Sequence, residues 1–202
     1  IFEQTGFISR LDAYMWETAC MRLQRWKNAG LTENYLSINI SQKDFYLLDV
    51  YKTITGLVEY YDIDPSNLHL EITETAVMNN PQTQLPLIAK LRNYGFLVEI
   101  DDFGSGYSSL NTLKDLQADI LKIDMGFLSK TAHQDRSKLI LQMIIALAKA
   151  LRMEVITEGV ETQDQVDFLK TYGCDIFQGY YFAKPMPIME FEMQYLNRVF
   201  KV

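Results

Sequence analysis

The segment Leu97-Val98-Glu99-Ile100-Asp101-Asp102-Phe103 joins the two features on which the interpretation of this chain depends. Its β-branched and aliphatic residues are typical of a strand that is buried in a sheet. The segment then turns polar at the adjacent carboxylates Asp101 and Asp102. A buried strand that ends in charged residues indicates that this end faces a functional site, because a core would favour apolar side chains there.

Five other runs along the chain share this β-branched and aliphatic character. Successive runs begin between 22 and 34 residues apart, a spacing typical of repeated βα units rather than of hairpins. The segments between them show helical periodicity, as in residues 43–61, so we expect the strands to be parallel. The five other predicted strands are Tyr35–Ser41, His69–Thr75, Ile120–Met125, Glu154–Val160 and Ile176–Ala183.

Two architectures contain repeated βα units, an open doubly wound sheet and a closed (β/α)8 barrel. No Gly-rich nucleotide-binding loop follows any of the predicted strands, which favours the barrel. Only six units are visible, and a long amphipathic helix from Leu11 to Gly30 precedes the first strand. We therefore predict an α/β fold, a TIM-type (β/α)8 barrel that lacks its first one or two strands, with about 45 residues expected upstream.

The composition indicates one globular domain over residues 1–202, with 48% hydrophobic residues and no compositionally biased segment. The formal net charge of −7 argues against contact with polymeric nucleic acid or with an anionic membrane, because both reward clustered basic residues. Cys20 and Cys174 are expected to be reduced thiols in the core, as in a protein of a reducing compartment.

The longest apolar stretch, Leu139–Leu151, has 13 residues, and a bilayer crossing needs roughly 20. The N-terminal residues carry no secretory signal. We expect a cytoplasmic domain, although other domains of the full protein can anchor it to a membrane.

Each of the six predicted strands carries polar side chains near its carboxyl end. In a parallel barrel these ends lie on one face, where barrel enzymes place their catalytic residues. Six of these polar side chains are carboxylates, and they account for six of the seven negative charges by which acidic residues exceed basic ones in the chain. One strand carboxylate alone is more often an exposed end or an ion-pair partner, but six strands together favour a site. The polar residues are Asn39, Glu71, Glu74, Asp101, Asp102, Lys122, Asp124, Glu158 and Gln178.

Carboxylates that converge in one cleft repel one another, and divalent cations relieve this repulsion. Oxygen donors together with the amide of Asn39 suit Mg or Mn. Zinc is disfavoured because His69 and His133, the only histidines, have no ligand partners at a useful spacing. The sequence therefore predicts a site for one or two hard divalent cations.

Lys122 interrupts an apolar run and shares a strand face with Asp124. A weaker hypothesis makes it the Schiff-base lysine of a barrel aldolase, but the surrounding carboxylates would keep its amine protonated. Asp101 and Asp102 are adjacent, so both can serve one cleft only if the strand ends between them. The glycines that follow, Gly104 and Gly106, indicate that it does.

Six short motifs follow one another: SINIS at 37–41, EITE at 71–74, DDFGSGYSSL at 101–110, LKID at 121–124, EGVE at 158–161 and QGY at 178–180. In this order they resemble the motifs of the EAL domain family, bacterial phosphodiesterases that linearise cyclic di-GMP. The resemblance runs from end to end of the chain. It implies a barrel with two divalent metal ions, Mg or Mn, at the carboxyl-terminal face.

The resemblance also implies residue roles. Asn39, Glu71 and Asp101 would hold one metal ion, and Asp101 with Asp102 and Glu158 would hold the second. In the family pattern, Lys122 orients the attacking water, and Glu158 and Asp102 join it as catalytic residues. Gln178, Asp124 and Glu74 are expected to bind the substrate or to support the loop at 103–109.

One departure from the family is the absence of a Glu-Ala-Leu tripeptide, whose glutamate is a metal ligand. The expected truncation explains this gap together with the missing strands. The leading hypothesis is a phosphodiesterase that converts cyclic di-GMP to linear pGpG as one module of a larger signalling protein. The alternative is a catalytically inactive cyclic di-GMP receptor or protein-interaction module of the same fold, and the residues upstream would decide between the two.

The apolar helix at Leu139–Leu151 is expected to be a buried barrel helix or part of a homodimer interface, because a helix that is apolar most of the way round is covered on most sides. Members of the family often dimerise near this region. On the interface interpretation, a charge at Ile145 would separate the subunits without unfolding them.

Overall fold

The structure, a computed structural model, describes residues 7–103, 116–124 and 134–196. Six strands form one sheet in which all neighbours are parallel and the strand order follows the chain. An open doubly wound sheet reverses its order at a switch point, whereas a barrel winds in one direction. The sheet is not closed within the described residues, so the predicted partial barrel is confirmed. The strands are β1 (Leu36–Ile40), β2 (Leu68–Thr73), β3 (Leu97–Asp101), β4 (Ile120–Asp124), β5 (Glu154–Glu158) and β6 (Ile176–Phe177).

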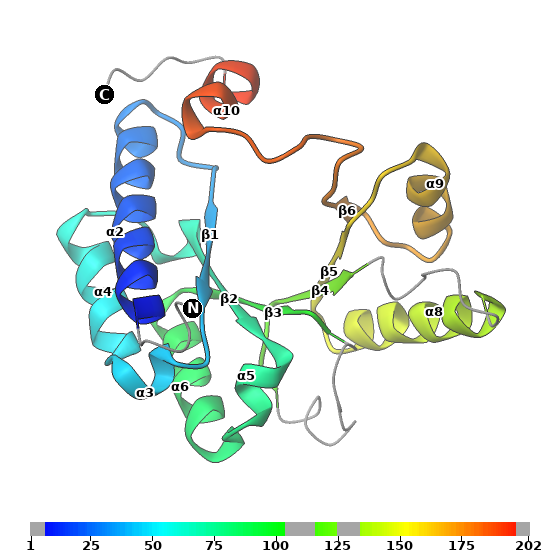
Figure 1. Cartoon of the computed structure of the whole chain (residues 1–202), viewed down its shortest axis with the longest axis horizontal. Coiled ribbons are helices and arrows are strands. Elements are labelled where there is room, and N and C mark those ends of the chain that lie inside the picture. Colours follow the sequence, from blue (N-terminus) through cyan, green and yellow to red (C-terminus); the bar gives the residue numbers. More distant parts are fainter. Residues whose placement is uncertain (1–6, 104–115, 125–133, 197–202) are drawn as a thin grey trace.

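Helices connect the strands and lie outside the sheet (Figure 1). Helix α2 runs beside β1, and α8 and α9 flank β5 and β6 at the other side of the molecule. The helices are α2 (Phe7–Asn28), α3 (Asp44–Leu47), α4 (Val50–Tyr60), the short 3-10 helix η1 (Pro65–Asn67), α5 (Glu74–Met78), α6 (Pro81–Tyr94), α8 (Gln134–Ala150), α9 (Gln163–Thr171) and α10 (Ile188–Tyr195).

Alternation along the central strands gives the sheet an apolar outer face and a polar inner face. Leu70, Ile100 and Leu121 belong to the core that the helices cover, and each is essentially inaccessible to solvent. Their neighbours along the strands, such as Glu71 and Lys122, point the other way because successive strand residues alternate. The inner face is therefore where polar chemistry can gather.

The segment predicted as one helix, residues 43–61, forms two helices, α3 and α4. Asp49 lies between them and accepts a hydrogen bond from the amide of Lys52 at 3.0 Å, which caps α4. Leu47, the last residue of α3, and Val50, the first of α4, continue the helical spacing of apolar residues across the break between the two helices. The periodicity alone therefore did not separate the two helices.

The last strand is shorter than the predicted Ile176–Ala183, because β6 ends at Phe177. The chain then turns against Val160, whose amide donates a hydrogen bond to the carbonyl of Gln178 at 3.1 Å. Gly179 has a φ of 157°, and a Cβ there would collide with the backbone of Val160. This close approach, which only glycine permits, ends the strand despite the aromatic residues that follow.

Helix α8 contains the predicted apolar stretch up to Ala150, but the role expected for Ile145 is wrong. Ile145 is fully buried, so a charge there would disrupt the core instead of separating subunits. The large apolar residues that α8 exposes to solvent are Leu139, Ile140 and Met143.

Helix α10 lies beside the end of α2, far from it in sequence (Figure 1). Glu192 of α10 is 1% exposed, and its Oε1 accepts hydrogen bonds from Nη1 of Arg22 and Nε1 of Trp26, both at 2.9 Å. These bonds attach the end of the described chain to its first helix.

Cys20 and Cys174 are both buried and carry free thiols, as expected. In the part of the chain that the structure describes, no helix has both the length and the apolar character needed to span a membrane.

Candidate active site

The inner face brings the predicted site residues together from neighbouring strands. Asn39 of β1 lies opposite Glu71 of β2 in the strand register, and Asp124 of β4 lies opposite Glu158 of β5. Asp101 is the last residue of β3, next to Thr73 of β2. The parallel arrangement thus places these side chains at the carboxyl ends of five adjacent strands, as the strand-end argument predicted.

The ammonium group of Lys122 lies at the centre of this group. Its Nζ is 2.7 Å from Oε1 of Glu71, 2.7 Å from Oε1 of Glu158 and 3.8 Å from Oδ1 of Asp101. The Lys122 side chain is 4% exposed. Four strands, β2 to β5, therefore contribute to one buried charged cluster.

The environment of Lys122 keeps its amine charged. Burial alone would lower the pKa of Lys122, but its hydrogen bonds to Glu158 and Glu71 outweigh this and raise the pKa above its ordinary value. Lys122 is therefore a hydrogen-bond donor at neutral pH. A Schiff base requires the neutral amine, so the arrangement argues against the aldolase hypothesis.

The carboxylates around Lys122 carry more negative charge than one ammonium neutralises. Burial raises the pKa of Glu71 and of Glu158, and Asp101 adds to both rises, although Lys122 opposes them. Each carboxylate would be more stable with further positive charge beside it. The cluster is thus suited electrostatically to bind a cation.

Asp102 follows Asp101 at the point where β3 ends. Its φ of 55° lies in the left-handed region, and its amide donates to Oδ1 of Asp101 at 2.9 Å. Burial raises the pKa of Asp102, and Asp101 and Asp124 add to the rise. The strand therefore ends between the two aspartates, as the sequence indicated, while Gly104 and Gly106 lie outside the described residues.

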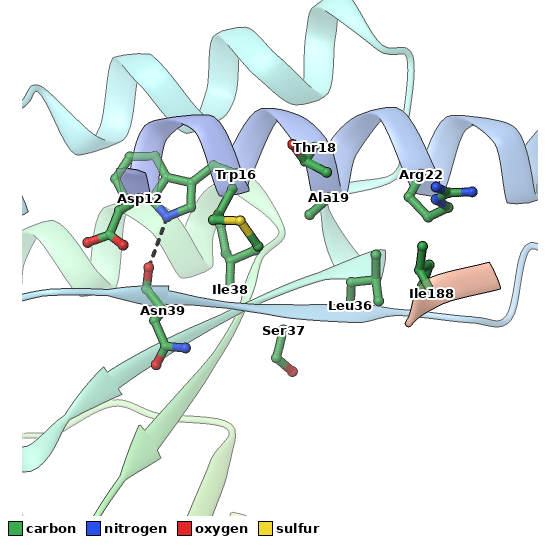
Figure 2. A pocket seen from close by; sticks show the side chains of 11 residues that line it. Asp12, Trp16, Thr18, Ala19, Arg22, Leu36, Ser37, Ile38, Asn39 and Ile188 are labelled. Atoms are coloured by element: carbon green, nitrogen blue, oxygen red, sulfur yellow. Dashed lines mark hydrogen bonds between the residues drawn. The ribbon is translucent and has the colours of Figure 1, made fainter. Parts of the chain in front are cut away.

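Strand β1 separates the site from an apolar cavity of about 400 Å³ between α2 and β1. Figure 2 shows Leu36 and Ile38 on the side that faces α2, and Ser37 and Asn39 on the opposite side. The backbone carbonyl of Asn39 accepts a hydrogen bond from Nε1 of Trp16 at 2.9 Å. This bond anchors β1 to α2 while the Asn39 amide stays on the inner face.

The remaining predicted residues lie around this cluster. Asp124 is exposed at the end of β4, and Glu74 is buried at the first position of α5. Gln178 is exposed just after β6, where its backbone N–H donates to the backbone carbonyl of Thr157 at 2.8 Å. Gln178 also lines a second cavity of about 490 Å³, which lies between Leu36 of β1, α10 and the segment that joins β6 to α10.

The donor chemistry of the site fits a hard divalent cation, because carboxylates from β2, β3 and β5 and the amide of Asn39 offer only oxygen ligands. A positive charge beside Glu71 and Glu158 would oppose the rise that burial causes in the pKa of each. Within the described ranges, no three His, Cys, Asp or Glu residues are grouped closely enough to hold a metal ion, and the Lys122 ammonium occupies the point where Glu71 and Glu158 meet.

Sequence reasoning did not single out a second polar group on the inner face. His69 and Glu99 are both buried, and Nδ1 of His69 lies 2.6 Å from Oε1 of Glu99. The signal was present in the alternation, because Glu99 shares a strand face with Asp101 and His69 shares one with Glu71. A charged residue in the middle of the apolar run 97–101 was the feature to notice.

Comparisons with known proteins place this arrangement in a family. Residues 1–185 match the model of the EAL domain. The bifunctional diguanylate cyclase/cyclic di-GMP phosphodiesterase MucR of Pseudomonas aeruginosa is 35% identical over 185 residues, which are 92% of this chain and 27% of that protein. The cyclic di-GMP phosphodiesterase NbdA of the same species is 35% identical over 190 residues, which are 94% of this chain and 24% of that protein.

A solved structure shares the fold. The PaMucR phosphodiesterase in its c-di-GMP complex superposes with a TM-score of 0.88 and 34% identity, over 94% of this chain and 76% of that one. The chain spans about a quarter of the length of the two curated relatives. On the match over residues 1–185, the chain belongs to the EAL domain family.

Proposed function

We propose that the domain is a metal-dependent phosphodiesterase that hydrolyses cyclic di-GMP to linear pGpG. The observation that carries the proposal is the inner-face cluster in which Lys122 binds Glu71 and Glu158 and lies near Asp101. Two relatives named as cyclic di-GMP phosphodiesterases and a related structure with bound c-di-GMP support it.

Two divalent cations, Mg or Mn, are assigned to the acidic strand ends. Asn39, Glu71 and Asp101 would hold one, and Asp101, Asp102 and Glu158 the other. When bound, such cations lower the pKa of a coordinated water and neutralise charge that develops on the phosphoryl group.

Side chains of the protein are proposed to position the attacking water and to accept its proton. Lys122, protonated, donates hydrogen bonds and orients the attacking water; it does not accept a proton. Glu158 and Asp102 are the proposed acceptors of the proton that the attacking water releases. The 2.7 Å bond from Lys122 holds Glu158 in a fixed position for that transfer.

The residues around the cluster are assigned to the substrate. Gln178, which lines the cavity after β6, would contact cyclic di-GMP, and Asp124 at the end of β4 would bind the substrate beside Glu158. Glu74 at the start of α5 would support the loop at 103–109.

The test measures the conversion of cyclic di-GMP to pGpG by chromatography, using the purified protein at its full encoded length with Mn²⁺ or Mg²⁺. Glu158→Gln is expected to lower kcat by about 100-fold or more, because it removes a proton acceptor. Asp119→Asn is the matched control: Asp119 pairs with Arg92 at the amino end of β4, away from the cluster. Absence of pGpG with both cations would overturn the proposal.

A second candidate is a receptor that binds cyclic di-GMP without cleaving it. The observation that favours it is the Lys122 ammonium, which lies 2.7 Å from Glu71 and from Glu158 and so already neutralises two of the proposed metal ligands. Saturable binding of cyclic di-GMP with no pGpG, measured on the full-length protein, would favour the receptor.

We also propose that the domain is a cytoplasmic homodimer and one module of a larger signalling polypeptide. The chain spans only about a quarter of two curated relatives, which supports its being one module of a larger polypeptide. The exposed apolar residues of α8 are the proposed contact surface between the two copies.

A further inference from the structure

A second polar cluster lies on the inner face, formed by Ser37, His69 and Glu99. Oε1 of Glu99 is 2.6 Å from Nδ1 of His69 and accepts a hydrogen bond from Oγ of Ser37 at 3.2 Å. The ring of Tyr35 stacks on the His69 imidazole, with centroids 3.9 Å apart and planes at 8°. His69 is 4% exposed and Glu99 is 1% exposed, so the pair is well shielded from water.

The cluster lies directly beneath the candidate metal ligands. Side chains two residues apart on a strand share a face and are separated by one step along the barrel interior. The register also places Glu99 opposite Glu71 on the β2–β3 ladder. Each residue of the cluster lies two positions before a candidate metal ligand on its own strand. The pairs are Ser37 and Asn39, His69 and Glu71, and Glu99 and Asp101.

Glu99 is a charged group at this position. Its carboxylate is hydrogen-bonded by His69 and Ser37, and it lies opposite Glu71 in the strand register. Glu99 thus adds negative potential at the Glu71 carboxylate, which favours a cation there.

A purely structural explanation of the pair is weak. Replacing a buried ion pair by apolar residues of similar volume is often neutral for stability or even favourable. The inner face already tolerates apolar residues such as Ile120 and Ile156, which are buried. A hydrogen-bonded acid and imidazole in this layer therefore call for a reason beyond the packing of the core.

We propose that the Ser37–His69–Glu99 cluster is a positioning layer that holds Glu71 and Asp101 in place for metal binding and adds negative charge beneath them. The inference rests on the proposed function, since it assigns the metal to those two carboxylates. His69 fixes Glu99 through Nδ1, and Glu99 in turn fixes the spacing of β2 and β3. Groups behind metal ligands commonly orient them and tune their affinity in this way.

The experiment measures the affinity for Mn²⁺ by calorimetry, without substrate, on the full-length protein and its variants. Glu99→Gln keeps the shape but removes the charge, and is expected to weaken binding about 10- to 100-fold. His69→Leu removes the donor and should weaken binding similarly, whereas His69→Asn, which can place an amide N–H where Nδ1 lies, should restore most of the affinity. Asp119→Asn is the control for the loss of a hydrogen-bonded carboxylate elsewhere, because Asp119 pairs with Arg92 just before β4 begins.

The double variant His69→Leu with Glu99→Leu keeps the test decisive if a single variant fails to fold. It removes both buried polar groups, so it is expected to fold with an unchanged thermal midpoint and yet to bind Mn²⁺ weakly. Unchanged Mn²⁺ affinity in this variant or in Glu99→Gln, in a protein whose parent binds Mn²⁺ and forms pGpG, would overturn the positioning layer alone. A parent that neither binds Mn²⁺ nor forms pGpG would overturn the proposed function as well.

Discussion

Lys122 is the residue whose charge holds the inner face together. It is the hydrogen-bonded cation between Glu71 and Glu158, and all three side chains lie away from bulk water. Removing one partner of a buried ion pair leaves the other charges uncompensated.

Lys122→Met is therefore expected to lower the free energy of unfolding by about 3 kcal/mol, measured by urea denaturation in the absence of metal. Lys122→Arg keeps the charge and should lose less. Equal stability of the parent and Lys122→Met would contradict the assigned ion pairs.

Asp12, on α2, gives a prediction of pH dependence. Burial raises its pKa to about 6, and the charge of Asp44 adds to the rise. The folded protein thus binds this proton more tightly than the unfolded chain, whose carboxyl has a pKa near 3.8. The stability that Asp12 contributes is present below that value and is lost as the pH rises through about 6.

Asp12→Asn should therefore raise the thermal midpoint relative to the parent more at neutral pH than at pH values near 4. Asp64 is the control of opposite sign, because its hydrogen bonds from Ser66 lower its pKa. Asp64→Asn should cost stability at neutral pH and less in acid. An Asp12→Asn shift that is the same at both pH values would show that Asp12 is not the titrating group.

At the scale of elements, α8 carries the prediction about assembly. Met143 is 63% exposed and Ile145 is fully buried on the same helix. If the exposed apolar face is the homodimer contact, Met143→Glu should give monomers in sedimentation while the thermal midpoint stays the same. Ile145→Asp is the contrasting variant, expected to unfold the domain. An unchanged oligomer in Met143→Glu would remove α8 from the interface.

Element order and type were predictable from periodicity, whereas element ends were decided by contacts distant in sequence. The structure contains all six predicted strands, because each is a run of β-branched and aliphatic residues that becomes stable once helices pack on it. The end of β6 was not predictable, because it depends on the packing of Gly179 against the backbone of Val160. The break between α3 and α4 depends on a single cap at Asp49, which the apolar pattern does not register.

At the scale of the whole molecule, parallel winding converts separate strand ends into one cluster. The sequence supported the gathering of Glu71, Asp101 and Glu158 because parallel carboxyl ends share one face. It did not predict that Lys122 would stand between two of them, since side-chain reach across strands depends on barrel stagger. Glu99 stood out in its apolar run, but its partner His69 could not be predicted, because the two meet only when β2 and β3 are paired.

The most direct measurement of the central claim is anomalous diffraction at the manganese edge from crystals of the full-length protein grown with Mn²⁺. The account predicts manganese peaks at the carboxyl ends of the strands, with oxygens of Asn39, Glu71 and Asp101 as ligands of one ion and those of Asp101, Asp102 and Glu158 as ligands of another. Well-ordered crystals in which these side chains bind no manganese, with Lys122 still joined to Glu71 and Glu158, would contradict it.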